Sequence, residues 1–324
     1  MQNSKRETIL AWVKHGHIAE HQLDAALREA GVYPARAEWI RFLGHLLLWS
    51  GAVMLAAAVI FFLAYNWRVL GRFGKFAVAE IPLLLAFVFA AWRGTESALG
   101  RAALFAAALF TGGLLALVGQ TYQTGADTFE LFATWAVAIL PWVGVARMPA
   151  LWLFWLLLAN TAIMLYFQLR PGIVDGIFAT ARPLWALFLF NTLAWAVWEA
   201  AALRLSWMRQ RWLVRSLAAL SSAQVTMLAN DAIFGEQNIP GIIAWLMWIS
   251  LAYTVYRRRI YELFVLACGV LSTVIVVTSV LVKILISGKA TDVSGFFLLI
   301  AMAVVGISGA GAWWLKKVSA EQRS

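Results

Sequence analysis

Long apolar runs separated by short polar gaps repeat along the chain from residue 42 almost to its end. A helix needs roughly 17 to 25 mostly apolar residues to cross a hydrocarbon layer of ~30 Å. The runs lie at about 42–65, 75–92, 102–120, 131–147, 149–169, 183–202, 215–230, 239–256, 261–282 and 294–315. This pattern predicts an all-α, polytopic membrane protein with about ten transmembrane helices.

Two places in this map are weaker than the rest. The run 215–230 contains several polar residues, namely Ser216, Ser221, Ser222, Gln224, Thr226 and Asn230. Between 131–147 and 149–169 the only separation is Arg147-Met148-Pro149. Proline disfavours the helical conformation in the residue before it, so the pattern is compatible with either two helices or one kinked helix there.

The first 40 residues carry charges throughout and no long apolar run, so we expect no cleavable signal peptide. Residues 8–15 and 19–30 are typical of two short helices that end at Gly16 and Gly31. One small apolar seam between them would use Ile9, Trp12, Val13, Ile18, Leu23 and Leu27. A hairpin of this size folds weakly alone, so residues 1–38 are expected to dock on a partner protein, another copy or the membrane surface; the alternative is a passive tail.

Composition supports a lipid environment and gives the orientation. Apolar residues make up 63% of the 324 residues, charged residues 13%, and the mean hydropathy is +0.79. The net charge of +10 comes from lysines and arginines in short gaps, mostly on one side, which argues for membrane orientation and against nucleic-acid binding. Both termini are therefore predicted to be cytoplasmic, with a hairpin at 1–40, a membrane domain at 41–315 and a tail at 316–324. The outward cluster Arg68, Arg72 and Lys75 departs from this rule.

Glu80 is the most informative charged residue, because a carboxylate inside an apolar run is costly and usually faces protein or water. It is a candidate proton or cation site, or else a structural ion pair with Arg72 or Lys75. The polar stretch GQTYQTGADTFELF at 119–132 turns at Gly125 and adds candidate binding residues on the outer side. The whole candidate binding set is Glu80, Asn66, Gln120, Tyr122, Asp127 and Glu130. Asp127 is also in position to cap the helix that begins at Thr128.

The sequence contains no recognisable catalytic pattern. His17 to His21 matches H-x-x-E-H with Glu20, but no domain surrounds it to supply a third zinc ligand, so these residues are interpreted as solvated. Glu199 and His45 lie in apolar runs near the cytoplasmic ends, where each is expected to reach water beside Arg204 and Arg41. The single cysteine, Cys268, excludes a disulfide within the chain. We therefore predict no enzyme, no catalytic residue, no metal and no cofactor.

Three phrases resemble a known family. They are LAWVKHGHIAEHQLDAAL, then FLAYNW with Lys75 shortly after it, then GQTYQTGADTFELFATWAVAILPW. Over roughly residues 8–145 the chain is similar to the bacterial predicted-membrane-protein family named domain of unknown function 2157. The resemblance implies a bacterial inner-membrane protein with a small cytoplasmic amino-terminal domain, and it implies no activity.

Two functional hypotheses follow. The first is a membrane scaffold or assembly component whose amino-terminal hairpin docks a partner while the helices provide the anchor. The second is a transporter or channel for a small polar solute or cation, which would use Glu80 and the 120–130 connection. The absence of a recognisable internal repeat favours the first, and the buried carboxylate favours the second.

Overall fold

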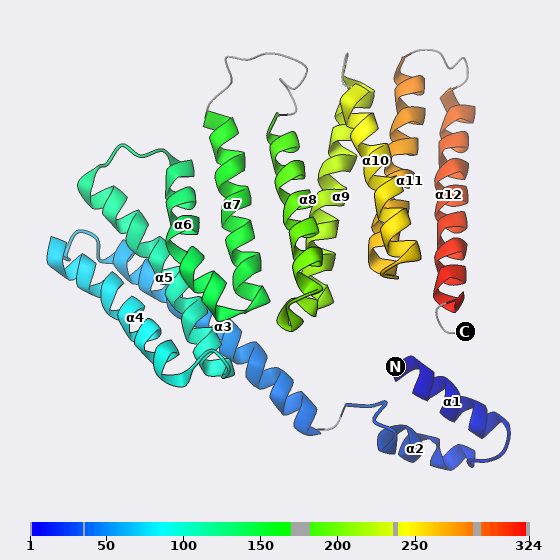
Figure 1. Cartoon of the computed structure of the whole chain (residues 1–324), viewed down its shortest axis with the longest axis horizontal. Helices are drawn as coiled ribbons and strands as arrows, with labels where there is room; N and C mark the ends of the chain where they lie inside the picture. The colour runs from blue at the N-terminus through cyan, green and yellow to red at the C-terminus, as the bar shows by residue number, and fades with distance from the viewer. Residues whose placement is uncertain (1, 35, 170–181, 236–238, 288–292, 322–324) are drawn as a thin grey trace. The chain divides into compact units, whose positions relative to one another are not determined.

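The computed structural model is all-helical, in agreement with the sequence. It describes residues 2–34, 36–169, 182–235, 239–287 and 293–321, and within them the chain forms twelve α-helices, two short 3₁₀ turns and no strand (Figure 1). The chain divides into two compact units, Met1–Thr124 and Gly125–Ser324.

The first unit begins with the helical hairpin. Its elements are α1 (Gln2–Lys14), the 3₁₀ turn η1 (Glu20–Gln22) and α2 (Leu23–Glu29). Gly16 and Gly31 follow the helices with φ of +75° and +69°, a left-handed conformation that glycine adopts without steric cost, so both predicted stops are confirmed.

Three long helices complete this unit: α3 (Arg36–Tyr65), α4 (Arg72–Arg93) and α5 (Ala98–Tyr122). The hydroxyl of Ser97 accepts a hydrogen bond from the Gly100 amide at 2.9 Å and starts α5. Many alanines line α5, and their small side chains let α4 lie close against it along most of its length. Helix α3 packs mainly on α5, so α5 is the most buried helix of the unit.

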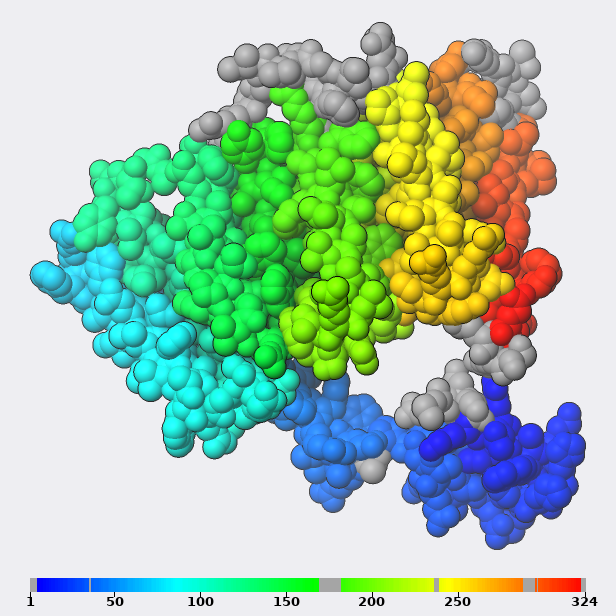
Figure 2. Space-filling model, in the orientation of Figure 1, coloured from blue at the N-terminus to red at the C-terminus, as the bar shows by residue number. Residues whose placement is uncertain are grey.

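The second unit contains the remaining helices. They are α6 (Thr128–Ala146), α7 (Pro149–Leu169), α8 (Arg182–Ala202), η2 (Ser206–Arg209), α9 (Arg211–Phe234), α10 (Ile239–Arg258), α11 (Leu263–Ile286) and α12 (Val293–Glu321). Figure 2 shows α10, α11 and α12 packed side by side. Each of the ten predicted membrane runs therefore corresponds to one helix, α3 to α12.

The boundary at residues 147–149 separates two helices. Helix α6 ends at Ala146, Arg147 adopts the left-handed conformation with φ of +48°, and Pro149 occupies the first turn of α7. Proline is well tolerated there, because the amide that it lacks has no partner inside the helix. The two helices then pack against each other as an antiparallel pair.

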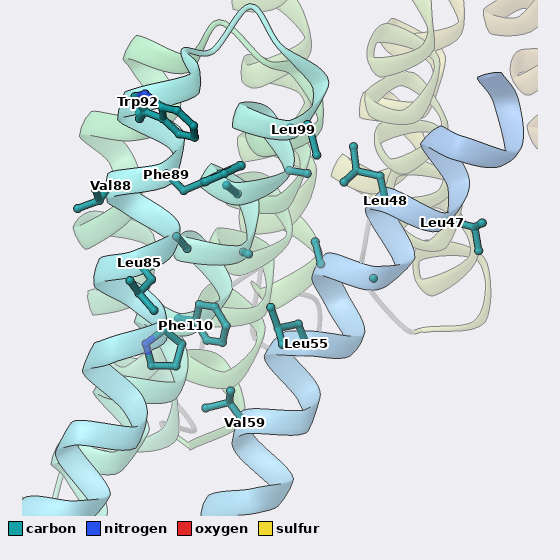
Figure 3. Close-up of a pocket in the computed structure, with 17 residues that line it drawn as sticks. Leu47, Leu48, Leu55, Val59, Leu85, Val88, Phe89, Trp92, Leu99 and Phe110 are labelled. Atoms are coloured by element: carbon teal, nitrogen blue, oxygen red, sulfur yellow. The ribbon is translucent and has the colours of Figure 1, made fainter. Parts of the chain in front are cut away.

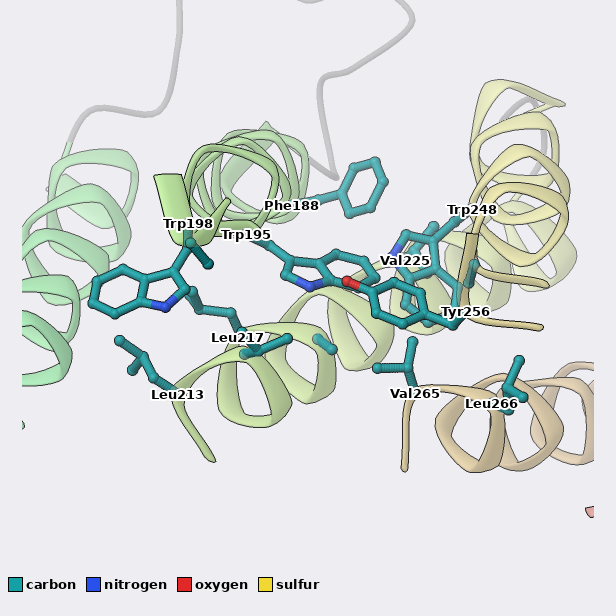
Figure 4. Packing of buried hydrophobic residues seen from close by; sticks show 14 of the residues in the cluster. Phe188, Trp195, Trp198, Leu213, Leu217, Val225, Trp248, Tyr256, Val265 and Leu266 are labelled. Carbon is teal, nitrogen blue, oxygen red and sulfur yellow. The ribbon is translucent and has the colours of Figure 1, made fainter. Parts of the chain in front are cut away.

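The weakly apolar run at 215–230 forms helix α9, whose surroundings account for its polar residues. Among the described helices, nine are long and apolar enough to cross a membrane, and α9 is the long helix that falls short. It spans 24 residues, or about 36 Å at 1.5 Å per residue, so its length is sufficient and its polarity is the reason. It packs on α8, α10 and α11, which bury half of its residues (Figure 4). The neighbouring helices replace lipid around its polar side chains.

Candidate functional site

Tyr122 and its neighbours form an aromatic cluster around two cations where α3, α4 and α5 meet. The guanidinium of Arg72 lies 4.4 Å from the centroid of the Tyr122 ring, and the Phe76 ring lies 6.1 Å from the same ring. The ammonium of Lys75 lies 3.7 Å from the Trp67 ring centroid. Aromatic faces attract cations by about 0.5–1 kcal/mol at exposed sites, so these rings stabilise the charges that depart from the orientation rule.

Glu80 does not take the partners that its position suggested. It lies exposed on α4, and within the described chain it makes no hydrogen bond or ion pair. The expected pairing with Arg72 or Lys75 is absent because both cations lie over aromatic rings. The local sequence showed how Arg72, Lys75 and Glu80 are spaced. It did not show that Arg72 and Lys75 would lie over the rings of Tyr122 and Trp67 instead of pairing with Glu80.

The other predicted binding residues are dispersed. The Asn66 side chain donates to its own helix at the carbonyl of Phe62, 2.9 Å away, and Gln120 is exposed at the end of α5. Asp127 occupies the position before α6, but its carboxylate makes no capping hydrogen bond; its backbone carbonyl accepts from the amide of Glu130 at 3.0 Å. Asp127 and Glu130 are exposed and belong to the second unit. Apart from this backbone hydrogen bond between Glu130 and Asp127, no hydrogen bond or ion pair in the described residues joins any two of the six.

A cluster of charges that the sequence interpretation missed lies at one end of the second unit. Arg211 donates from Nη1 to Glu199 Oε2 at 3.1 Å and from Nε to Glu262 Oε2 at 3.0 Å. Arg215 holds the other oxygen of Glu262 at 2.8 Å, and the Tyr256 hydroxyl donates to Glu199 Oε1 at 2.5 Å. These contacts join three helices, α8, α9 and α10, to Glu262 at the start of α11.

This cluster corrects the expectation for Glu199. Its partners are Arg211 and Tyr256 rather than Arg204, and its side chain is largely buried rather than extended into water. The sequence did contain one hint of this cluster. Glu199, Arg211 and Glu262 all lie near the predicted cytoplasmic ends of their apolar runs, so their charges are at a similar depth in the membrane. Which of the many arginines there would pair could not be inferred from that hint.

A second network of uncharged groups follows α9 further along its length. Asn191 exchanges hydrogen bonds with Asn160 at 2.6 and 3.1 Å and donates to Gln224 at 3.3 Å. Ser221 pairs with Thr192 at 2.6 Å and accepts from the indole of Trp248 at 2.9 Å.

The same arrangement recurs at the next turns, where Thr226 and Ser272 pair at 2.6 Å and Trp245 donates to Ser272 at 2.8 Å. Aromatic rings close the space around these groups: Trp195 stacks on Tyr256 with centroids 5.4 Å apart and planes 12° apart (Figure 4). Four polar residues of α9 thus bond to neighbouring helices, namely Ser221, Ser222, Gln224 and Thr226. Such contacts hold helices together in lipid, where they are worth about 0.6 kcal/mol each on average.

The amino-terminal hairpin has the small seam that the sequence predicted, with one exception. Ile9 and Leu27 are only 5% and 3% exposed, and Val13, Ile18 and Leu23 are partly buried beside them. Trp12 is 50% exposed, so its indole lies outside the seam. His17, Glu20 and His21 are exposed, and the described residues contain no group of three side chains placed to hold a metal ion.

Comparison with known proteins agrees with the resemblance in the sequence. No curated protein and no solved structure matches the chain. The charged cluster around Arg211 lies outside the part of the chain that matches a family model, which runs from within α1 to the start of α7. Over residues 10–152 the chain matches the model of the family described as "Predicted membrane protein (DUF2157)", which is the family that the three phrases indicated.

Proposed function

We propose that this chain is a membrane-anchored docking component, in which the amino-terminal hairpin binds a protein partner and the helices hold it at the bilayer. The observation that carries the proposal is the half-exposed Trp12 on a hairpin that already buries Ile9 and Leu27. Tryptophan is among the residue types enriched at the positions that dominate protein–protein binding energy, together with tyrosine and arginine.

The net positive charge of α1 supports a partner with an acidic surface. Helix α1 carries Lys5, Arg6 and Lys14 against one carboxylate, Glu7. A partner with an apolar socket for Trp12 and an acidic rim for Lys14 complements this surface. In this proposal the hairpin lies in the cytoplasm, on the side that carries most of the lysine and arginine. A bacterial inner membrane as the location of the helices is what the family resemblance implies. It assigns no catalytic step and no cofactor to the chain.

Transport through Glu80 has less support. A solute pathway needs polar groups that line a common space across the membrane. Glu80 is exposed on α4, the Asn66 amide is used by its own helix, and no hydrogen bond or ion pair in the described chain connects these two residues to each other or to the 120–130 connection. The polar groups of the second unit bond mainly to one another.

The test uses the full chain in its native membrane with a photoreactive amino acid at Leu10, which is exposed near Trp12 on α1. We expect one discrete protein adduct, and we expect Trp12→Ala to lower its yield at least tenfold, since loss of a dominant interface residue costs 2 kcal/mol or more. Trp39→Ala is the matched control, because Trp39 is equally exposed and lies outside the hairpin.

Three outcomes are decisive. An adduct of the expected kind with a second protein, identified by mass spectrometry and lost in Trp12→Ala, supports the proposal. An adduct of twice the mass of this chain shows self-association in place of a separate partner. Adducts with lipid only, or a protein adduct that Trp12→Ala leaves unchanged, refute docking through this surface.

A further inference from the structure

An apolar groove of about 830 Å³ lies between α3, α4 and α5 (Figure 3). One end is lined by Val59, Pro82 and Phe110, and the end near the α4–α5 turn is lined by Leu48, Trp92 and Leu99. Every side chain that lines it is apolar. A groove of this volume lies within the range of specific ligand sites, about 300–1,000 Å³.

The packing of the three helices creates this space. Helix α4 lies along α5, whereas α3 packs more extensively against α5 than against α4. Trp49 packs edge-on against Phe105, with centroids 5.6 Å apart, and fixes α3 on the far side of the floor. The floor itself consists of Ala102, Ala103 and Ala106, whose small side chains leave the volume between α3 and α4 open.

The length of the groove indicates what occupies it. Its lining runs from Pro82 to Trp92 on α4, which corresponds to about 15 Å of helix, and from Leu47 to Val59 on α3, about 18 Å. One leaflet contributes about half of the ~30 Å hydrocarbon thickness. A transmembrane helix of another chain needs the full thickness, whereas the acyl chains of a lipid need one leaflet. The groove therefore fits lipid tails better than a helix.

Arginines from all three helices lie near the end of the groove at the α4–α5 turn. The guanidinium of Arg93 lies 5.7 Å from the ring centroid of Trp92, which lines this end. Arg101, beside the floor, donates to the carbonyl of Glu96 at 3.4 Å within the turn that joins α4 and α5. Arg41 is seven residues before Leu48, so it lies on the same face of α3, two turns further out. The carboxylates near these three arginines in the sequence are Glu96, in that turn, and Glu38, one turn before Arg41 on α3.

We propose that this groove binds the acyl chains of an anionic glycerophospholipid from the leaflet on the side of the α4–α5 turn, with the phosphate held by Arg93 and Arg101. The apolar walls provide affinity for the tails, and arginine provides two-pronged hydrogen bonding to phosphate. The orientation from charge makes this the cytoplasmic leaflet. The site is independent of the docking function proposed for the hairpin.

The test is native mass spectrometry of the purified full chain, stripped of lipid and then loaded with phosphatidylglycerol or phosphatidylcholine. We expect one retained phosphatidylglycerol per chain and at least tenfold weaker retention of phosphatidylcholine. Ala103→Phe fills the floor and should lower retention of both lipids at least tenfold. Arg93→Gln with Arg101→Gln should lower phosphatidylglycerol to the phosphatidylcholine level and leave phosphatidylcholine unchanged.

Matched controls separate the site from the lipid shell around any membrane protein. Ala64→Phe adds the same bulk at an exposed position of α3 outside the groove, and Arg68→Gln with Arg204→Gln removes two exposed arginines that do not line it. Equal lipid retention in Ala103→Phe and Ala64→Phe refutes the groove. Unchanged preference for phosphatidylglycerol in the Arg93/Arg101 variant refutes the headgroup site, and this variant stays informative if Ala103→Phe folds poorly.

Discussion

Arg211 and Glu262 are 51 residues apart in the sequence, and their side chains meet at 3.0 Å. Glu262 directly precedes α11, where a carboxylate often caps the helix, yet it makes no capping hydrogen bond. Its two oxygens instead accept from Arg211 and Arg215, on the first turns of α9. The beginning of α11 is thus attached to the beginning of α9, and Glu199 and Tyr256 extend the attachment to α8 and α10.

Removal of the shared carboxylate tests this attachment. Glu262→Gln leaves two partly buried arginines with one carboxylate, Glu199, between them. We expect a loss of about 1–2 kcal/mol in the free energy of unfolding, less than for a fully buried pair because Arg215 is half exposed. Denaturant titration of the purified chain in mild detergent measures it. Glu321→Gln breaks the more exposed pair with Arg257 and should change stability by under ~0.5 kcal/mol. Equal effects of the two substitutions would contradict the role of the cluster.

The amide network predicts a comparable effect deeper in the second unit. Asn191 is fully buried and bonds to Asn160 and Gln224. Asn191→Ala should cost about 1–2 kcal/mol, because the partly buried Asn160 and the buried Gln224 lose a partner and a small cavity remains. Thr161→Ala is the control, since the Thr161 hydroxyl is bonded to its own helix at Leu157. The same unfolding titration distinguishes them, and no difference between the two variants would show that the network is energetically unimportant.

Close approach of α9 and α10 predicts a steric effect at one glycine. A methyl group on Gly241 would lie 2.4 Å from the carbonyl oxygen of Leu228, a backbone atom that cannot turn aside. We expect Gly241→Ala to destabilise the chain by about 1–3 kcal/mol. Gly144→Ala meets no atom within 4 Å and should be neutral or stabilising by up to ~1 kcal/mol, because alanine favours helix. Thermal unfolding of both variants, followed by circular dichroism, is the measurement; equal midpoints would contradict the close contact.

The polarity of α9 predicts how it enters the membrane. As an isolated segment in a translocation reporter, α9 should insert poorly, whereas α11 should insert efficiently. A longer segment with α8 to α11 should restore insertion of α9, because the neighbouring helices supply partners for Ser221, Gln224 and Thr226. Replacing these three residues by leucine should allow α9 to insert alone. Efficient insertion of the unaltered isolated segment would refute this dependence.

Much of the fold was predictable because it depends on local chemistry. The ten apolar runs became ten helices, and Gly16 and Gly31 ended the helices of the hairpin, since each signal acts within a few residues. The candidate site was less predictable. The sequence singled out Glu80, but the structure leaves it exposed, and its expected partners Arg72 and Lys75 lie over Tyr122 and Trp67; that choice depends on how α3, α4 and α5 pack.

The sequence by itself determined that the helices lie in lipid, that the fold is all-helical, and approximately where every long helix begins and ends. These properties depend on the hydropathy and length of each segment taken alone. Only the tertiary structure decided that the least apolar segment, α9, would be enclosed by α8, α10 and α11, and that Glu199 would meet Arg211 rather than Arg204. The physical reason is that a polar group in lipid must be satisfied by some partner, while the identity of that partner depends on which helices pack together.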